Sequence, residues 1–255
     1  MAFDTTTRNR LAKFVAEARR VLTEEFSEQL QSLYGISAAG GIAPLEKLTH
    51  LDAEGLELAA TLRQRIAYLT SSSPAAGDAT KPAIDRLTRE QAFTVLNRLA
   101  AIRMAEKRGL IVESVGQQYQ SRGFKVFESV AGSAIGDTYD RYRCYLFCLF
   151  DELAIDLGSL FDRRSPQALL FPREQPLLAL LTLLDDADIQ DLWAEDETIG
   201  WIYQYYNDPA ERRRCARNRP PLATAASWLS AISSSPPATW SSFSPTTPSV
   251  ASGMR

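Results

Sequence analysis

The sequence predicts an all-α fold, with a multi-helix domain over residues 1–214 followed by a disordered tail over residues 215–255. Apolar residues recur at spacings of three and four over long stretches, as on the buried face of a helix. No stretch shows the alternation and β-branched enrichment of a strand. After Glu211 there is no Asp or Glu, and Ser, Pro, Ala and Thr dominate, a composition that cannot form a core.

The first two helices are expected near the N-terminus and from residue 52 onwards. Hydroxyls of residues 5–7 can cap the first helix, whose apolar stripe ends near Leu33 before Gly35. The second helix begins at Asp52, after the only histidine, His50, to which we assign a structural role. Residues 71–82 have the composition of a flexible connector.

Residues 83–107 predict the strongest helix of the chain. The segment also carries a set of basic residues: Arg86, Arg89, Arg98, Arg103, Lys107 and Arg108. A solvated face paired with nearby acids is the favoured interpretation. The alternative is a basic strip that faces phosphates, which requires several of these arginines on one side.

Residues 111–136 are interrupted by glycines, so short helices and turns are expected there. Residues 138–157 are densely apolar and aromatic, which predicts a helix at the centre of a bundle. Pro172 and Pro176 interrupt the chain before another buried helix at residues 177–184. Residues 132–137 resemble a glycine-rich cofactor loop only faintly, because no strand precedes them, and we reject that interpretation.

Composition excludes several classes of protein. The net charge of −3 and pI near 5.4 give no global basic field for nucleic acid. No apolar run resembles a signal peptide or reaches the ~20 residues of a membrane span. Three cysteines provide no disulfide framework, which fits a cytoplasmic protein. The sequence has one histidine, which disfavours a hydrolytic triad and a metal site built from several histidines.

No catalytic, cofactor-binding or metal-binding residue is predicted, although two groups were weighed. Cys144 and Cys148 stand one helical turn apart and could share a metal ion. No second pair of Cys or His residues is present to complete four ligands, so we favour the interpretation that both are buried thiols. The acidic groups could supply acid/base chemistry, but helix caps and dipole partners are favoured. These acids are Asp151, Glu152, Asp185, Asp186 and Asp188.

Residues 193–206 combine an acidic cluster with closely spaced aromatics. Glu195, Asp196 and Glu197 precede Trp201 and three tyrosines. Such aromatics can stack on bases, but the acids would repel phosphates. We therefore expect these side chains to pack against a neighbouring domain.

Four segments resemble the N-terminal region of large adenine-specific DNA methyltransferases of phage-defence loci. They are residues 89–106, 142–152, 170–174 and, most specifically, 193–206 leading to Arg214. The resemblance is to the PglX-like enzymes of BREX and phage-growth-limitation systems, and to related single-chain restriction-modification enzymes. It runs from about Ala2 to Arg214.

The resemblance implies a helical region that precedes a catalytic domain binding S-adenosylmethionine. In that family an Asn-Pro-Pro-Tyr/Phe loop receives the flipped adenine of double-stranded DNA for methylation at N6. Neither that loop nor the glycine-rich cofactor loop occurs here; residues 218–221, Asn-Arg-Pro-Pro, are only a superficial echo. The resemblance thus implies an inactive fragment, whose partners would be the missing methyltransferase domain and other defence proteins.

The tail predicts a shift of reading frame near Arg214. Residues 215–255 can be back-translated into permitted codons, and the resulting DNA can then be translated in the frame that starts at the third base of each codon. One such translation resembles the family's usual continuation and includes Asn-Gln-Phe-Phe-Thr-Pro-Arg-Tyr. First and second codon bases fix most of that text, so chance agreement over its length is improbable. A natural low-complexity tail is the alternative. If the frame is intact, the chain is a stand-alone helical module that binds DNA or defence proteins; an independent enzyme is disfavoured.

Overall fold

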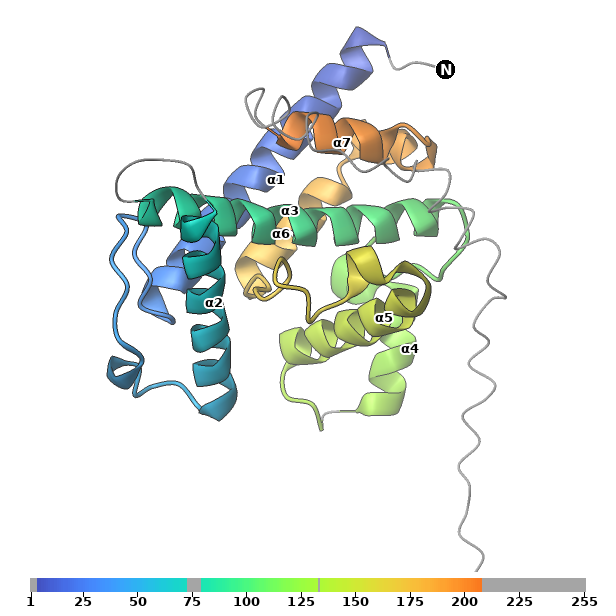
Figure 1. The fold of residues 1–255 in the computed structure, drawn as a ribbon. Helices are drawn as coiled ribbons and strands as arrows, with labels where there is room; N and C mark the ends of the chain where they lie inside the picture. The colour runs from blue at the N-terminus through green and yellow to red at the C-terminus, as the bar shows by residue number, and fades with distance from the viewer. Residues whose placement is uncertain (1–3, 73–78, 133, 208–255) are drawn as a thin grey trace, which may run out of the picture.

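The computed structural model describes residues 4–72, 79–132 and 134–207, and its regular elements are all helices (Figure 1). This confirms the all-α prediction; within these ranges the only β-type pairing is an isolated bridge between Ile36 and Ile42. The predicted tail, residues 215–255, lies outside the described residues, as do residues 208–214 of the predicted domain. The elements are α1 (Thr5–Ser32), η1 (Leu45–Lys47), α2 (Ala53–Ser71), α3 (Thr80–Lys107), η2 (Gln118–Gln120), α4 (Arg122–Ala131), α5 (Thr138–Phe161), α6 (Glu174–Leu184), η3 (Ala187–Ala194) and α7 (Thr198–Tyr206).

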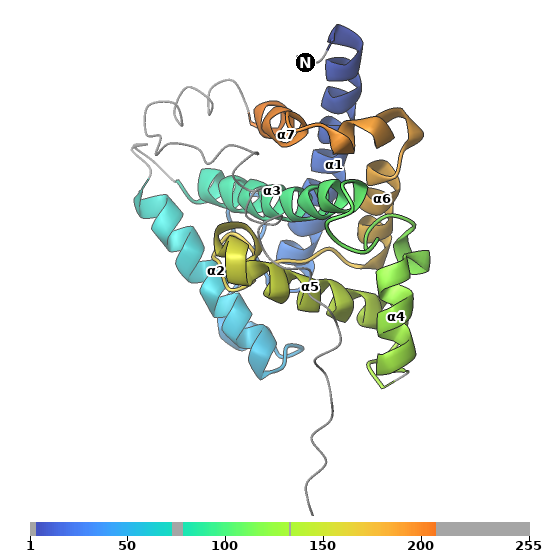
Figure 2. The same ribbon diagram turned by 90° about the vertical axis from the view of Figure 1, so that its right-hand side faces the viewer.

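Helix α3 is the centre of the fold. It crosses the middle of the molecule, with α7 above it, α2, α4 and α5 below it, and α1 running past it from above to below (Figures 1 and 2). Helices α1, α2, α5 and α7 all contact it. Its buried positions include Leu87, Leu96, Leu99 and Ile102. It begins at Thr80, three residues earlier than predicted, and Pro82 is tolerated because it lies in the first turn.

The prediction that the helix over residues 138–157 would be central is wrong. Helix α5 packs one face inward through Tyr142, Leu146 and Phe150. Its opposite face reaches solvent, and Ile155 is 83% exposed. The error arose because many of its apolar residues are only half-buried, and composition alone cannot distinguish a half-covered helix from a surrounded one.

Helix α1 buries the predicted stripe, including Leu11, Phe14 and Phe26. Its N-cap differs from the prediction: Asp4 accepts a hydrogen bond from the Thr7 amide at 2.7 Å, so none of the three threonines serves as the cap. The N-cap of α2 is Asp52, as predicted, which accepts from the Gly55 amide at 2.8 Å. No described helix has the length and apolar character needed to cross a membrane.

An ion pair between a buried carboxylate and a partly exposed arginine joins α1 to the start of α6. The Glu25 carboxylate accepts bonds from the backbone and side chain of Arg173, with Arg173 N, Nε and Nη2 at 2.9, 2.9 and 2.8 Å. Burial alone would raise the pKa of Glu25, but the bonds from Arg173 and Gln29 outweigh it and lower that pKa. The ionised carboxylate therefore holds the two helices together.

Candidate functional site

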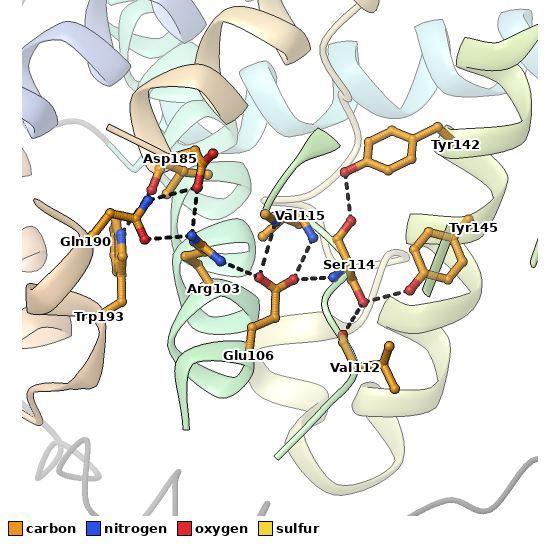
Figure 3. Close-up of polar contacts among 12 residues, drawn as sticks. Arg103, Glu106, Val112, Ser114, Val115, Tyr142, Tyr145, Asp185, Gln190 and Trp193 are labelled. Carbon is orange, nitrogen blue, oxygen red and sulfur yellow. Dashed lines mark hydrogen bonds and ion pairs between the residues drawn. The ribbon is translucent and has the colours of Figure 1, made fainter. Parts of the chain in front are cut away.

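The most concentrated group of buried charges lies at the C-terminal end of α3. We call it the Arg103–Glu106 cluster: Arg103, Glu106, Asp185, Gln190 and the backbone of residues 114–116 (Figure 3). Arg103 and Glu106 stand on adjacent turns of α3. Asp185 follows α6 and Gln190 lies in η3. The cluster thus joins the end of α3 and the loop that follows it to residues 185–190, which are distant in sequence.

The Arg103 guanidinium is held by three acceptors. Its Nη1 lies 3.0 Å from Glu106 Oε2, and its Nη2 donates to Asp185 Oδ1 at 2.7 Å and to Gln190 Oε1 at 2.8 Å. The side chain is only 7% exposed. Removing any one acceptor would leave a buried cation undercompensated, which is costly.

Glu106 holds the loop that follows α3. Its Oε1 accepts the backbone N–H groups of Ser114 and Val115, both at 2.5 Å, and its Oε2 accepts that of Gly116 at 3.2 Å. Burial raises the pKa of Glu106, although these donors and Arg103 oppose the rise. With its oxygens committed to these donors, this carboxylate is not free to act as a general base.

The same loop is held from its other side by two tyrosines of α5. Tyr142 donates its hydroxyl proton to the Ser114 carbonyl at 2.9 Å, and the hydroxyls of Ser114 and Tyr145 lie 2.6 Å apart. Burial keeps the pKa of Tyr142 well above its usual value. Both phenols therefore stay neutral and connect α5 to the cluster (Figure 3).

Two glycines make this close packing possible. A Cβ on Gly116 would collide with the Arg103 guanidinium, and one on Gly123 would collide with the Tyr145 hydroxyl and lie 3.0 Å from the Glu113 carbonyl oxygen. Between them, Gln117 and Gln118 adopt left-handed backbone angles, with φ of 61° and 51°. Non-glycine residues rarely adopt such angles, so the surrounding contacts must hold them there.

An open cavity of about 450 Å³ adjoins the cluster. It is lined by Arg103, Glu106, Lys107, Glu113, Gln117, Asp185, Ala187 and Gln190. Arg103 and Glu106 in its wall bond to each other, to Asp185 and Gln190, and to the backbone of residues 114–116, while Lys107 and Glu113 add one charge of each sign. The cavity therefore has mixed charge, and its innermost charged groups connect helices.

The predictions for the basic residues of α3 were wrong in part. Arg98 points inward, where it donates to the carbonyls of Leu160 and Asp162, both at 2.7 Å. Burial lowers its pKa to about 10. Arg103 is buried in the cluster. These two arginines therefore belong neither to a solvated face nor to a strip that faces phosphates, whereas Arg86 pairs with Glu90 at the surface as favoured.

The cluster was missed, although the sequence carries a signal for it. Arg98 lies three residues after Val95 and four before Ile102, so it falls on a buried stripe of the helix. Arg103 and Glu106 extend the neighbouring stripe, which passes through Leu96 and Leu99 at the same spacing of three and four. Charged residues at stripe positions of a long helix indicate internal ion pairs. The partners of Arg98 and Arg103 outside α3, however, come from segments about 60 to 90 residues away, which spacing cannot identify.

The structure corrects the interpretation of both cysteines as buried thiols. Cys144 is half-buried, but Cys148 is exposed. Within the described ranges, no group of three or more His, Cys, Asp or Glu side chains is placed to hold a metal ion.

The acidic candidates separate in space. Asp151 and Glu152 lie inside α5, so assigning them to a helix end was wrong; Asp151 pairs with Arg163 through two bonds of 2.7 and 2.6 Å. Asp186 caps η3 by accepting from the Asp188 amide at 2.9 Å, as favoured. Asp185 instead belongs to the Arg103–Glu106 cluster. These acids do not form one catalytic pair.

The remaining candidates have local contacts. His50 Nε2 lies 2.9 Å from the Leu33 carbonyl oxygen, a contact that suits a structural role. Gly132 and Gly136 flank the connection from α4 to α5, where a helix precedes, so the context of a cofactor loop is missing.

Several aromatics of residues 193–206 pack within this domain, whereas Trp201 and Tyr205 stay partly exposed, so the expected packing against a neighbouring domain stays a prediction for these two. Trp193 is fully buried, 5.5 Å from Phe14 in an edge-on contact, and donates its Nε1 proton to the Leu184 carbonyl at 2.9 Å. Phe93 of α3 contacts Tyr203 and Tyr206 at 5.7 and 4.8 Å between centroids. These contacts fasten η3 and α7 onto α1 and α3.

No model of a known protein family, no curated protein and no solved structure matches this chain.

Proposed function

We propose that residues 1–214 are the helical N-terminal region of a PglX-like adenine-specific DNA methyltransferase. The proposal rests on the resemblance carried by residues 89–106, 142–152, 170–174 and 193–206. On this account the chain does not transfer a methyl group by itself. Residues encoded beyond the frame shift would hold S-adenosylmethionine and the flipped adenine of double-stranded DNA, and the enzyme would act in the cytoplasm within a defence system.

The observation that supports this proposal is the mutual packing of the four resembling segments. Residues 89–106 contact each of the other three: Gln91 accepts the Leu170 amide at 3.0 Å, Arg98 lies over the Phe150 ring, and Phe93 packs on Tyr206. Phe147 and Phe171 meet edge-on at 5.0 Å. The segments that carry the resemblance are therefore in contact with one another within one folded unit, as expected of a shared domain.

The alternative, a stand-alone module that binds DNA, gains little from the surface of the described residues. Several surface arginines that could contact phosphate are paired with acids, among them Arg20, Arg86 and Arg163. Helix α3, the predicted basic strip, turns two of its arginines inward. Salt-sensitive binding of double-stranded DNA by the chain alone would nevertheless favour this module over the fragment.

The test compares the chain with a version whose reading frame is restored by one base near the Arg214 codon. Equilibrium dialysis measures binding of S-adenosylmethionine, and transfer of its labelled methyl group measures formation of N6-methyladenine in DNA. We expect both activities from the restored chain and neither from the present one. Cofactor binding by the present chain, or an inactive restored chain that is folded, would overturn the proposal.

A further inference from the structure

The outer face of α5 presents two thiols. Cys144 and Cys148 are one helical turn apart, so their Cβ atoms lie about 5–6 Å from each other. Both are free, Cys148 is exposed and Cys144 is half-buried. The pair is thus accessible from solvent and does not contribute to the closely packed core.

The surroundings of the pair leave the two sulfurs as its metal-binding atoms. Asp151 and Glu152 follow Cys148 by three and four residues, and each carboxylate oxygen of Asp151 is engaged by Arg163. Within the described ranges, no three His, Cys, Asp or Glu side chains are placed together to hold a metal ion, so neither acid completes a larger site with the thiols. Arg163 also lies over the ring of Phe147, 4.6 Å from its centroid, and Phe147 directly precedes Cys148 in α5. The pKa of Arg163 is raised, first by Asp151 and also by Cys148 and Cys144. A cation therefore stands where two thiolates would carry excess negative charge.

We propose that Cys144 and Cys148 form a two-coordinate site for a soft monovalent metal ion, Cu(I). Thiolate ligands select soft ions such as Cu(I). A linear sulfur–metal–sulfur unit needs sulfurs about 4.6 Å apart, twice a metal–thiolate bond of about 2.3 Å. Side chains one turn apart on a helix can reach that separation. Zinc, which takes four ligands in structural sites, is not satisfied by this pair.

Binding of Cu(I) to the two thiols releases protons and involves no change of oxidation state. Each thiol loses one proton to solvent and forms one bond to the ion, so two protons are released per Cu(I) and no electron is transferred. The resulting dithiolate complex carries one negative charge, which the Arg163 guanidinium partly compensates. The site is independent of the proposed methyltransferase function.

The experiment titrates the full-length chain with Cu(I) against a coloured Cu(I) chelator, without oxygen or added thiols. The parent carries Cys215→Ser, which removes the third thiol, and the unsubstituted chain is the matched control. We expect one Cu(I) per chain in both, and at least about a 100-fold weaker affinity in Cys144→Ser and in Cys148→Ser, because each variant loses the chelate. X-ray absorption of the loaded parent is expected to show two sulfur neighbours.

Three results would overturn the proposal. The first is equal affinity of Cys148→Ser and the parent, and the second is loss of tight binding on Cys215→Ser alone. The third is displacement of Cu(I) by a modest excess of Zn²⁺. Circular dichroism of each variant checks that α5 remains helical; both substitutions lie outside the closely packed core, so we expect unchanged spectra.

Discussion

Single buried residues, rather than surface pairs, connect distant parts of this chain. Glu25 links α1 to α6, and Glu106 links α3 to the loop that α5 holds from its other side. An exposed pair such as Arg20 and Glu17 contributes little, because solvent screens it. Predictions at this scale therefore concern buried charges and the glycines that leave room for them.

Glu25 gives the fold an acid-sensitive contact. Its pKa is lowered in the folded chain, so the stability that it contributes is present above its unfolded-state value near 4.5 and is lost as pH falls through the lowered value. We expect Glu25→Gln to reduce the free energy of unfolding by about 1–3 kcal/mol at pH 7, since donors of Arg173 lose their carboxylate. Urea unfolding across pH should show the difference shrinking in acid. A difference that stays constant down to pH 3 would contradict this role.

Gly116 tests the Arg103–Glu106 cluster without removing a charge. We expect Gly116→Ala to destabilise the fold by about 1–3 kcal/mol, because the added methyl group collides with a guanidinium that three acceptors hold in place. Gly200→Ala is the control: its methyl group meets no atom within 4 Å, and alanine favours the helix. Equal stability of the two variants in urea would show that Arg103 moves freely.

At the scale of elements, α7 and η3 close the core between α1 and α3. Two tryptophans of this region differ in burial: Trp193 is fully buried, whereas Trp201 lies partly exposed, stacked on Tyr205. We expect Trp193→Ala to cost about 3–5 kcal/mol, since it removes a core ring and leaves a cavity.

Trp201→Ala should cost clearly less, since part of its ring already faces solvent. Thermal unfolding followed by circular dichroism compares the two variants. If Trp201→Ala proved the more damaging, the outer face of α7 would be the structurally important one.

The elements themselves were largely predictable, and their arrangement was not. Apolar spacing located α1, α2, α3 and α6 because local periodicity reports which face of a helix is buried. It could not tell that α3 and not α5 is surrounded, since that depends on contacts between segments far apart in sequence. For the same reason Arg98 and Arg103 were placed at the surface: their acceptors at residues 160–190 are brought to them only by the fold.

At the scale of the whole molecule, the described residues form a helical unit whose buried polar groups hold its helices together. The charged cluster beside the cavity joins α3 to the loop after it and to η3, and the thiol pair of α5 lies apart from it on the outer face of that helix. This division suits a domain that supports chemistry carried out by another part of a larger protein, which is the role we propose. The proposal places the catalytic chemistry in the DNA sequence downstream of the Arg214 codon.

Resequencing the gene from the Trp193 codon to beyond the Arg255 codon tests that account most directly, with translation in all forward frames. We predict that a neighbouring frame continues from the Arg214 codon into a glycine-rich cofactor loop and an Asn-Pro-Pro-Tyr/Phe motif. A confirmed frame through Arg255 with no such text downstream in any frame would contradict the account, and the helical domain would then have to function without a methyltransferase partner encoded beside it.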